Sequence, residues 1–346
     1  MAKSGALNGK LVVLMGGSGF IGNYVAQALL ERGARVRIAA RHPEKAFKLK
    51  PLANLGQMQF ARCDASDRQS VDRCIAGADA VVNLVGAFSG NLRRLMGEAP
   101  GWMAEAAARG GAQAFVHVSA IAAEPEDETE IEYAAAKKLG EERVLAAFPK
   151  ATILRPSILF GEDDNFINMF AGLISTLPVL PVFGPDAKLQ LVYVDDVAEA
   201  AVRALEDPGK HGGKIYELGG PEELSMMEIN EAIAAAQKRK RTFLPMPDGL
   251  SATFAALPGT PMGSDQWKLL KQGNVASLFE GHAMMRHKIR NYEVTWGAES
   301  NYRDLGPHQA VTAMYECPLD LIDIELTPQD LRQAQRRGIP AERVAL

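Results

Sequence analysis

The chain has 346 residues, of which 47% are hydrophobic and 23% are charged, and its formal net charge is −4. This composition is typical of a globular protein and excludes a largely disordered chain, while the length allows one large α/β domain with a smaller one appended. The weakly negative charge gives no indication of a nucleic-acid partner. Three cysteines without CxxC spacing argue against a disulfide framework and favour a reduced compartment.

No apolar run is long enough for a transmembrane segment, and the first residues lack the hydrophobic stretch of a signal peptide. We therefore expect a cytoplasmic protein, with peripheral membrane attachment left open. Two short basic runs lie at residues 238–241 and 286–290. We interpret the first as a solvated surface at a helix end rather than a site for nucleic acid or anionic lipid.

Short apolar runs alternate with helical patterns over the first two thirds of the chain. We expect strands at residues 11–15, 36–40, 58–63, 77–86, 114–119 and 151–155. Helical patterns follow the first strand and recur near residues 69–75, 102–109 and 133–147. This alternation predicts an α/β fold, with a Rossmann-type doubly wound parallel sheet over residues 8–220. Pro100 interrupts one crossover segment, so we expect that helix to start late.

After residue 160 the pattern loosens, and we expect substrate-loop insertions within this domain. The expected elements are a loop at 177–184, a helix at 194–205 opened by Asp195 or Asp196, a strand at 214–218, a small and mainly helical C-terminal cap at 221–280, and a tail at 281–346. The tail has no assigned role. Its one clear pattern predicts a terminal helix over 328–337.

A glycine-rich turn, Gly16-Gly-Ser-Gly19-Phe-Ile-Gly22, follows the first strand and opens the first helix. Gly16 permits a tight turn, Gly19 lets the backbone approach a pyrophosphate, and Gly22 allows close contact between helix and strand. The helix N-terminus offers unpaired N–H groups to phosphates. This position after a strand favours dinucleotide binding over a purely structural turn.

Three further strand ends complete the predicted cofactor site. The second strand ends in Arg41, where NAD sites usually have a carboxylate, so the sequence favours NADP(H) over NAD(H), with an exposed arginine as the alternative. Asp64 ends the third strand and is placed to accept a hydrogen bond from an adenine amino group. Leu84, Val85 and Gly86 follow the fourth strand, where their backbone is expected to wall the adenine ribose.

Tyr133 and Lys137 are four residues apart, on one face of a predicted helix. A nearby ammonium group, together with a positive nicotinamide ring, favours the phenolate of a tyrosine, which then serves as the acid or base of a carbonyl–alcohol interconversion. Ser119, at the end of the fifth strand, is the candidate residue that assists Tyr133 in catalysis. The alternative is that Tyr133 and Lys137 are an ordinary pair of surface residues without a role in catalysis. His117, inside the same strand, is expected to be a hydrogen-bonded core residue, and we expect no metal site.

Together, these motifs resemble the short-chain dehydrogenase/reductase superfamily. More narrowly, segments from about residue 10 to 277 resemble the atypical group around alpha-subcomplex subunit nine of respiratory NADH:ubiquinone oxidoreductase (complex I) and its bacterial relatives. The segments in question begin at Gly16, Asn83, Val116, Ile153, Val192, Tyr216 and Asp265. The resemblance implies an extended short-chain fold, tightly bound NADP(H), and association with complex I subunits at the inner membrane or with quinone metabolism.

The resemblance also assigns site residues. It implies that the pyrophosphate is held by Gly16, Ser18, Gly19, Phe20 and Ile21. It further implies that Arg41 binds the 2′-phosphate, Asp64 the adenine, and Lys137 and Pro156 the nicotinamide end.

One departure from the superfamily pattern is Ile121, which occupies the place of the usual Ser or Thr beside the tyrosine. Two functions therefore remain open. The first is an NADP(H)-dependent oxidoreductase acting on an apolar alcohol, ketone or quinone-related compound, with Tyr133 as acid or base and Lys137 and Ser119 assisting it. The second is a non-catalytic NADP(H)-binding accessory or assembly subunit of complex I.

Overall fold

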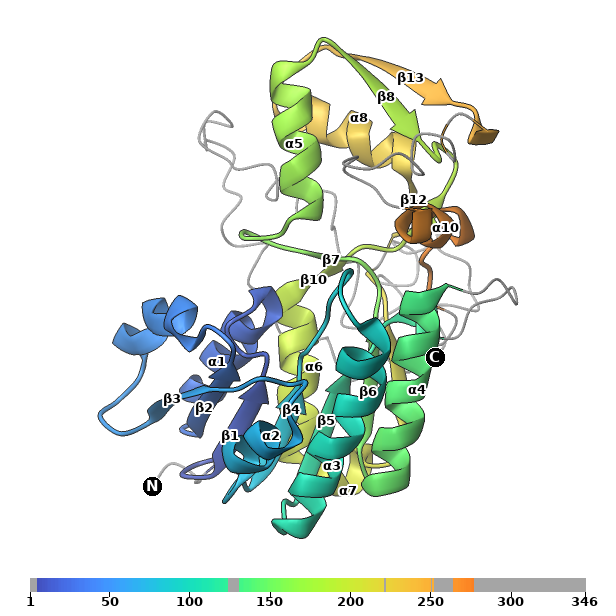
Figure 1. The fold of residues 1–346 in the computed structure, drawn as a ribbon. Helices are drawn as coiled ribbons and strands as arrows, with labels where there is room; N and C mark the ends of the chain where they lie inside the picture. Colours follow the sequence, from blue (N-terminus) through green and yellow to red (C-terminus); the bar gives the residue numbers. More distant parts are fainter. Residues whose placement is uncertain (1–4, 124–130, 221, 250, 252–263, 277–346) are drawn as a thin grey trace, which may run out of the picture.

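The computed structural model describes residues 5–123, 131–220, 222–249, 251 and 264–276. Its centre is a seven-stranded parallel sheet with the order β11-β6-β5-β4-β1-β2-β3 (Figure 1). The predicted Rossmann-type sheet is therefore confirmed. The predicted tail helix at 328–337 lies outside the described residues. Within the described part of the chain, no helix has both the length and the apolar character needed to cross a membrane.

The strands of this sheet are β1 (Leu11–Met15), β2 (Arg35–Ala40), β3 (Met58–Arg62), β4 (Ala80–Asn83), β5 (Ala114–Val118), β6 (Thr152–Pro156) and β11 (Ile215–Leu218). Every residue of β1, β4, β5 and β6 is buried, as expected for strands covered on both faces. Continuous runs of apolar side chains thus explain why the sequence predicts these strands to within a few residues.

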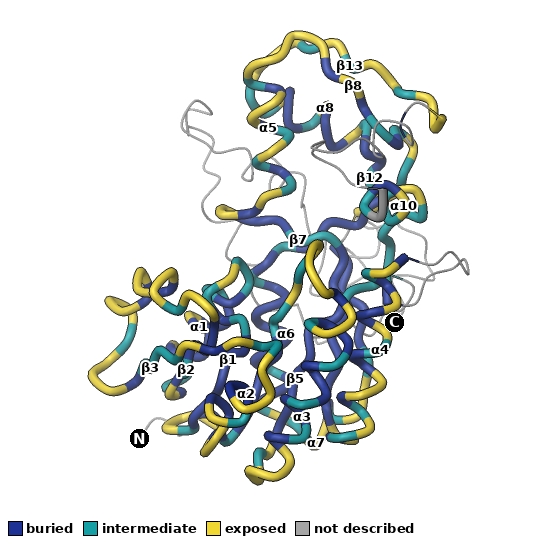
Figure 2. Tube along the Cα trace, viewed as in Figure 1, coloured by how far each residue is buried: buried dark blue, intermediate teal, exposed yellow. Residues whose placement is uncertain are grey.

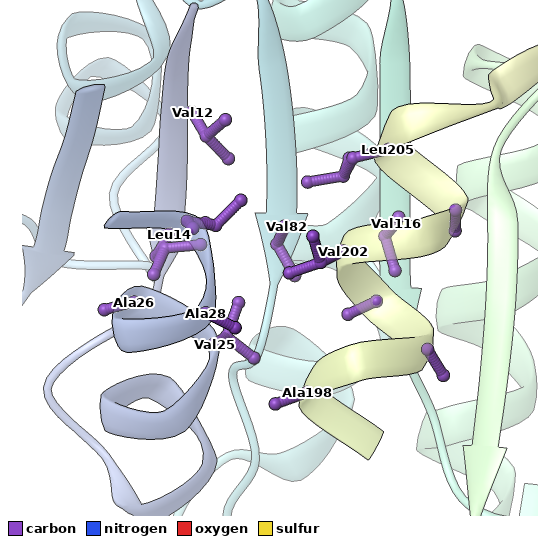
Figure 3. Close-up of a cluster of buried hydrophobic side chains, with 14 of the residues drawn as sticks. Val12, Leu14, Val25, Ala26, Ala28, Val82, Val116, Ala198, Val202 and Leu205 are labelled. Carbon is purple, nitrogen blue, oxygen red and sulfur yellow. The ribbon is translucent and has the colours of Figure 1, made fainter. Parts of the chain in front are cut away.

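Two layers of helices cover the sheet. On one face lie α1 (Phe20–Glu31) and α6 (Val194–Glu206), whose small side chains pack on the strands. Figure 3 shows Val25 and Val202 from these helices beside Val82 of β4. The other face is covered by α2 (Arg68–Ile75), α3 (Ala99–Arg109) and α4 (Glu132–Ala147).

The shorter elements of the described chain connect or extend these layers. They are η1 (Pro43–Leu52), η2 (Arg93–Glu98), η3 (Ile121–Ala123), β7 (Leu159–Phe160), β9 (Lys188–Leu189), β10 (Val192–Tyr193), α7 (Pro208–His211), β12 (Leu224–Ser225) and α10 (Ser264–Gln272). The helix α6 begins at Val194 with Tyr193 as its cap, and no side chain caps it, so the expected opening by Asp195 or Asp196 is wrong.

A second core lies beyond the carboxyl ends of the strands (Figures 1 and 2). It is formed by α5 (Phe166–Thr176), β8 (Val179–Phe183), α8 (Met226–Ala236) and β13 (Thr242–Met246). The expected loop at 177–184 is wrong, because β8 pairs in parallel with β13. Pro181 lies within β8. Its missing N–H is tolerated because β8 belongs to a two-stranded sheet, in which both strands are edge strands.

The helix α3 does not start late. It begins at Ala99, directly after the π-helical turn η2, and Pro100 lies in its first turn. The Ala99 N–H still donates to the Arg94 carbonyl of η2, so Pro100, which has no N–H, lies at the junction between the π-helical turn and the α-helix.

A buried ion cluster ties α4 to the sheet. The guanidinium of Arg155 in β6 donates to the Glu141 carboxylate at 2.8 Å and lies 3.7 Å from a Glu217 oxygen in β11. All three side chains are less than a tenth exposed. Because α4 carries the predicted Tyr133 and Lys137, this cluster fixes the helix that positions them.

Candidate functional site

The glycine-rich turn packs directly against the segment that follows β4. The φ angle of Gly16 is +79°, and its N–H donates to the Ala39 carbonyl at 2.8 Å. A Cβ atom on Gly16 would lie 3.2 Å from backbone atoms of Leu84 and Val85. At Gly22, a Cβ atom would lie 2.4 Å from the Gly17 carbonyl oxygen. Both positions therefore require glycine, as the sequence predicts.

The N-terminus of α1 is open to a ligand. Its cap residue, Gly19, provides no side-chain hydrogen bond, and its first turn has no acidic residue. The N–H groups of the first turn of a helix have no intrahelical acceptor and present a partial positive charge. Gly19 is exposed, whereas Ser18, Phe20 and Ile21 are half-buried around it. This end of the helix fits a diphosphate group.

The backbone after β4 is fixed by a buried asparagine. The Val85 N–H donates to Asn83 Oδ1 at 3.0 Å, so the Asn83 amide nitrogen donates in turn to His117 Nδ1 at 2.9 Å. Burial, reinforced by the Lys137 ammonium, lowers the pKa of His117 to about 3, so the imidazole is neutral. The expectation that His117 is a hydrogen-bonded core residue is confirmed.

Two arginines lie near Asp64 at the opposite end of the site. Hydrogen bonds from Ser66 hold the pKa of Asp64 below its ordinary value, and the charges of Arg41 and Arg94 lower it further. The guanidinium of Arg94 donates to the Ser66 carbonyl at 2.8 Å and 3.0 Å. The Arg41 side chain is exposed and makes no hydrogen bond within the described chain. Arg94 is not found from the sequence, because nothing in its local pattern indicates that η2 lies beside the end of β3.

Tyr133 and Lys137 lie in the first two turns of α4. Lys137 is 4% exposed, and its Nζ donates to the Val118 carbonyl at 3.2 Å and lies 5.9 Å from the centroid of the Tyr133 ring. Burial lowers the pKa of Lys137 to about 8, against the opposing charge of Glu141. Burial also raises the pKa of Tyr133 to about 12. The protein groups alone therefore keep the Tyr133 phenol protonated at neutral pH.

Phe88 is a site neighbour that sequence reasoning missed. Its ring stacks on Tyr133 with a centroid distance of 4.8 Å and an interplanar angle of 12°, although 64% of Phe88 is exposed. Gly86 and Gly90 flank it, and Gly90 has a φ angle of +87°. An aromatic residue between two glycines after β4 is the signal that could have identified it.

Ser119 follows β5, and Pro156 ends the neighbouring strand β6. Both are buried, and Pro156 lies opposite Leu218 of β11. The Ser119 N–H donates to the Leu154 carbonyl at 2.7 Å. Its Oγ is buried without a hydrogen-bond partner among the described residues. Such an orphaned hydroxyl is costly, so it fits a site completed by a polar group of a ligand.

Comparison with known proteins places this geometry in a family. The model of the NAD dependent epimerase/dehydratase family matches residues 12–219, which include the glycine-rich turn and the Tyr133–Lys137 pair. The chain belongs to this family. Membership indicates a nicotinamide dinucleotide as cofactor and confirms the predicted resemblance to short-chain dehydrogenases.

The narrower resemblance is also confirmed. The mitochondrial NADH dehydrogenase (ubiquinone) 1 alpha subcomplex subunit 9 of Arabidopsis thaliana is 30% identical over 340 residues, which cover 91% of this chain and 83% of the relative. Its counterpart in Mus musculus is 31% identical over 70% of this chain and 64% of the relative. A ceramide reductase of Caulobacter vibrioides is 28% identical over 57% of this chain and 62% of the relative.

Solved structures of this family share the fold at low identity. The UDP-glucuronic acid 4-epimerase of Bacillus cereus, in complex with UDP-glucuronic acid and NAD, has a TM-score of 0.63 and 18% identity. The match covers 88% of this chain and 100% of that one. At this identity the similarity establishes the architecture only.

Proposed function

We propose that this protein binds NADP(H) across the carboxyl ends of β1, β2 and β4 and acts as a short-chain oxidoreductase on an apolar ketone, alcohol or quinone-related compound. The observation that carries the proposal is the Gly16 turn, which is closed against the backbone of Leu84 and Val85 and leads into an uncapped helix. That cradle suits a diphosphate with a nucleoside on either side.

The arrangement of side chains supports a place for each part of the cofactor. The first turn of α1 holds the diphosphate, and the exposed Arg41 holds the 2′-phosphate beside Arg94. Asp64 accepts from the adenine amino group, while Leu84, Val85 and Gly86 wall the adenine ribose. Lys137 and Pro156 lie at the nicotinamide end, where the buried Ser119 hydroxyl still lacks a partner within the described chain.

When bound, the dinucleotide supplies or accepts the hydride. The protein contributes the proton. Because burial keeps the Tyr133 phenol protonated, its hydroxyl is set to donate to the oxygen of a carbonyl substrate, which favours the direction of reduction. Phe88 covers one face of the Tyr133 ring and limits the approach of water, and Lys137 stabilises the phenolate that remains.

Cofactor titration of the Arg41→Ala variant tests the proposal. We expect NADPH affinity to fall about 10- to 100-fold, because a charge-assisted contact to the 2′-phosphate is lost, while NADH affinity stays unchanged. The measurement is a fluorescence or calorimetric titration with both reduced dinucleotides. Arg35→Ala is the matched control, since Arg35 is exposed at the opposite end of the same strand. Equal losses for NADPH and NADH would contradict the assignment of Arg41, and no binding of either would refute the proposed function.

A second function, a non-catalytic accessory subunit of complex I, is favoured by two observations. Relatives that cover most of this chain are named as complex I subunits, and Ile121 stands where short-chain enzymes have a hydroxyl. On this hypothesis the protein lies peripheral to the inner membrane. Purification in mild detergent from its own cells should then recover the chain together with complex I subunits, and a protein recovered only alone would count against this alternative.

A further inference from the structure

The outer end of the second core is a surface that the proposed cofactor site does not use. We call it the cap tip and define it as residues 169–179 and 238–244. The cap tip has four basic side chains, at residues 238–241, and no acidic one, and the next acidic residues along the chain are Asp164, Asp186, Glu231 and Asp248. Because the whole chain has a net charge of −4, positive charge is concentrated at this end.

Apolar side chains form a stripe along α5 at the cap tip. Met169 and Leu173 are four residues apart, which places them on one side of α5, and Leu177 caps the C-terminus of the helix. They are 38%, 36% and 42% exposed. The opposite side of α5 is buried through Ile167 and Ile174 in the second core. The helix is therefore apolar on both sides, and only one of them has a partner within the described chain.

The neighbouring strands continue this surface. Val179 of β8 and Leu244 of β13 are 45% and 48% exposed, and these strands pair along their whole length (Figure 1). The Arg241 guanidinium donates to the carbonyls of Ile174 and Ser175 at the end of α5, at 2.7 Å and 3.3 Å. These bonds hold the basic run beside the apolar stripe.

The exposed apolar and basic residues of the cap tip favour one kind of binding partner. Of the nine large apolar residues exposed in the described chain, five lie at the cap tip. Single exposed apolar residues are ordinary, but a group of them beside a run of four basic side chains matches a surface that inserts into a bilayer whose headgroups are negative. No exposed aromatic ring is present among these five to stack on nucleic-acid bases.

We propose that the cap tip docks on the surface of an anionic membrane, with Leu173, Leu177 and Val179 entering the headgroup layer and Arg239 and Lys240 bound to lipid phosphates. This proposal replaces the interpretation of residues 238–241 as a solvated surface, because the exposed apolar residues beside them are not evident from the sequence. The proposal is independent of the proposed function, because it involves none of the cofactor residues.

Vesicle binding of the full chain tests the proposal. We expect cosedimentation with phosphatidylcholine vesicles in which about a third of the lipid is phosphatidylglycerol, and little binding to phosphatidylcholine alone. Removing two charges with Arg239→Gln and Lys240→Gln should weaken partitioning about 25-fold, at about fivefold per basic side chain. Leu173→Ser with Leu177→Ser should weaken it at least as much.

The matched control is Lys210→Gln with Lys214→Gln. Both lysines are exposed at the other end of the molecule, near α7, and their loss changes the net charge equally. This control should bind vesicles like the unchanged protein. Equal weakening by the control, or no binding to anionic vesicles, would overturn the proposal. If the cap-tip variants instead abolish recovery of a protein partner while vesicles never bind, the surface is a protein interface and the proposal is wrong. NADPH titration of each variant verifies folding separately.

Discussion

Replacing Tyr133 with phenylalanine is expected to reduce carbonyl turnover by about 100- to 10,000-fold, the range typical of a lost general acid. The ring that stacks on Phe88 is kept, and only the hydroxyl that donates the proton is removed. NADPH affinity should therefore stay near that of the unchanged protein. The measurement is NADPH oxidation in the presence of a panel of apolar ketones and quinones, analysed for kcat and KM.

Tyr216→Phe is a matched control for this prediction. Tyr216 is buried, whereas Tyr133 is half-buried, and the Tyr216 hydroxyl bonds to His211 Nδ1 at 2.9 Å, on a strand at the edge of the sheet. Its loss should cost about 1 kcal/mol of stability and leave turnover unchanged. Unaltered turnover in Tyr133→Phe would rule out the acid role of Tyr133. An unchanged protein that binds NADPH but reduces none of the compounds in the panel would favour the non-catalytic alternative.

The second large effect concerns stability. Arg155→Met should lower the free energy of unfolding by about 3–5 kcal/mol, because it leaves the buried Glu141 and Glu217 carboxylates without the cation that compensates them. Urea unfolding followed by circular dichroism measures the change. Since α4 depends on this cluster, NADPH affinity should also weaken at intermediate urea concentrations.

A surface ion pair provides the comparison. Arg109 lies 2.7 Å from Asp72, and both side chains are about half exposed. Arg109→Met should cost less than about 1 kcal/mol, because water replaces the lost partner. Similar losses for the two variants would show that the Arg155 cluster is not the anchor of α4.

Most of the sheet could be predicted because its central strands are largely apolar and are buried on both faces. The errors arose where distant segments decide the structure. Pro178 and Pro181 indicate a loop locally, yet Pro181 lies in a strand because β13, some sixty residues later, pairs with β8. Pro100 indicates an interruption locally, but it falls in the first turn of α3 because η2 precedes it.

The residues of the candidate site also fall into two groups, those that the sequence predicts and those that it does not. Gly16, Gly22 and the Tyr133–Lys137 pair follow from short spacings, because their roles depend on one turn and one helix face. Phe88 and Arg94 were missed, since each reaches its position only through the packing of η2 and the segment after β4 on their neighbours. Local sequence does not encode such neighbours.

The place of β1 in the sheet has one more consequence. It lies between β2 and β4, so the chain leaves β1 toward one face and β4 toward the other. β1 and β4 thus form a seam at which the connections diverge to opposite faces, and open α/β sheets bind their ligands at such a point. Evolution can therefore lengthen or exchange the loops that border the seam and change the molecule accepted there, while the strands beneath keep the same order and spacing.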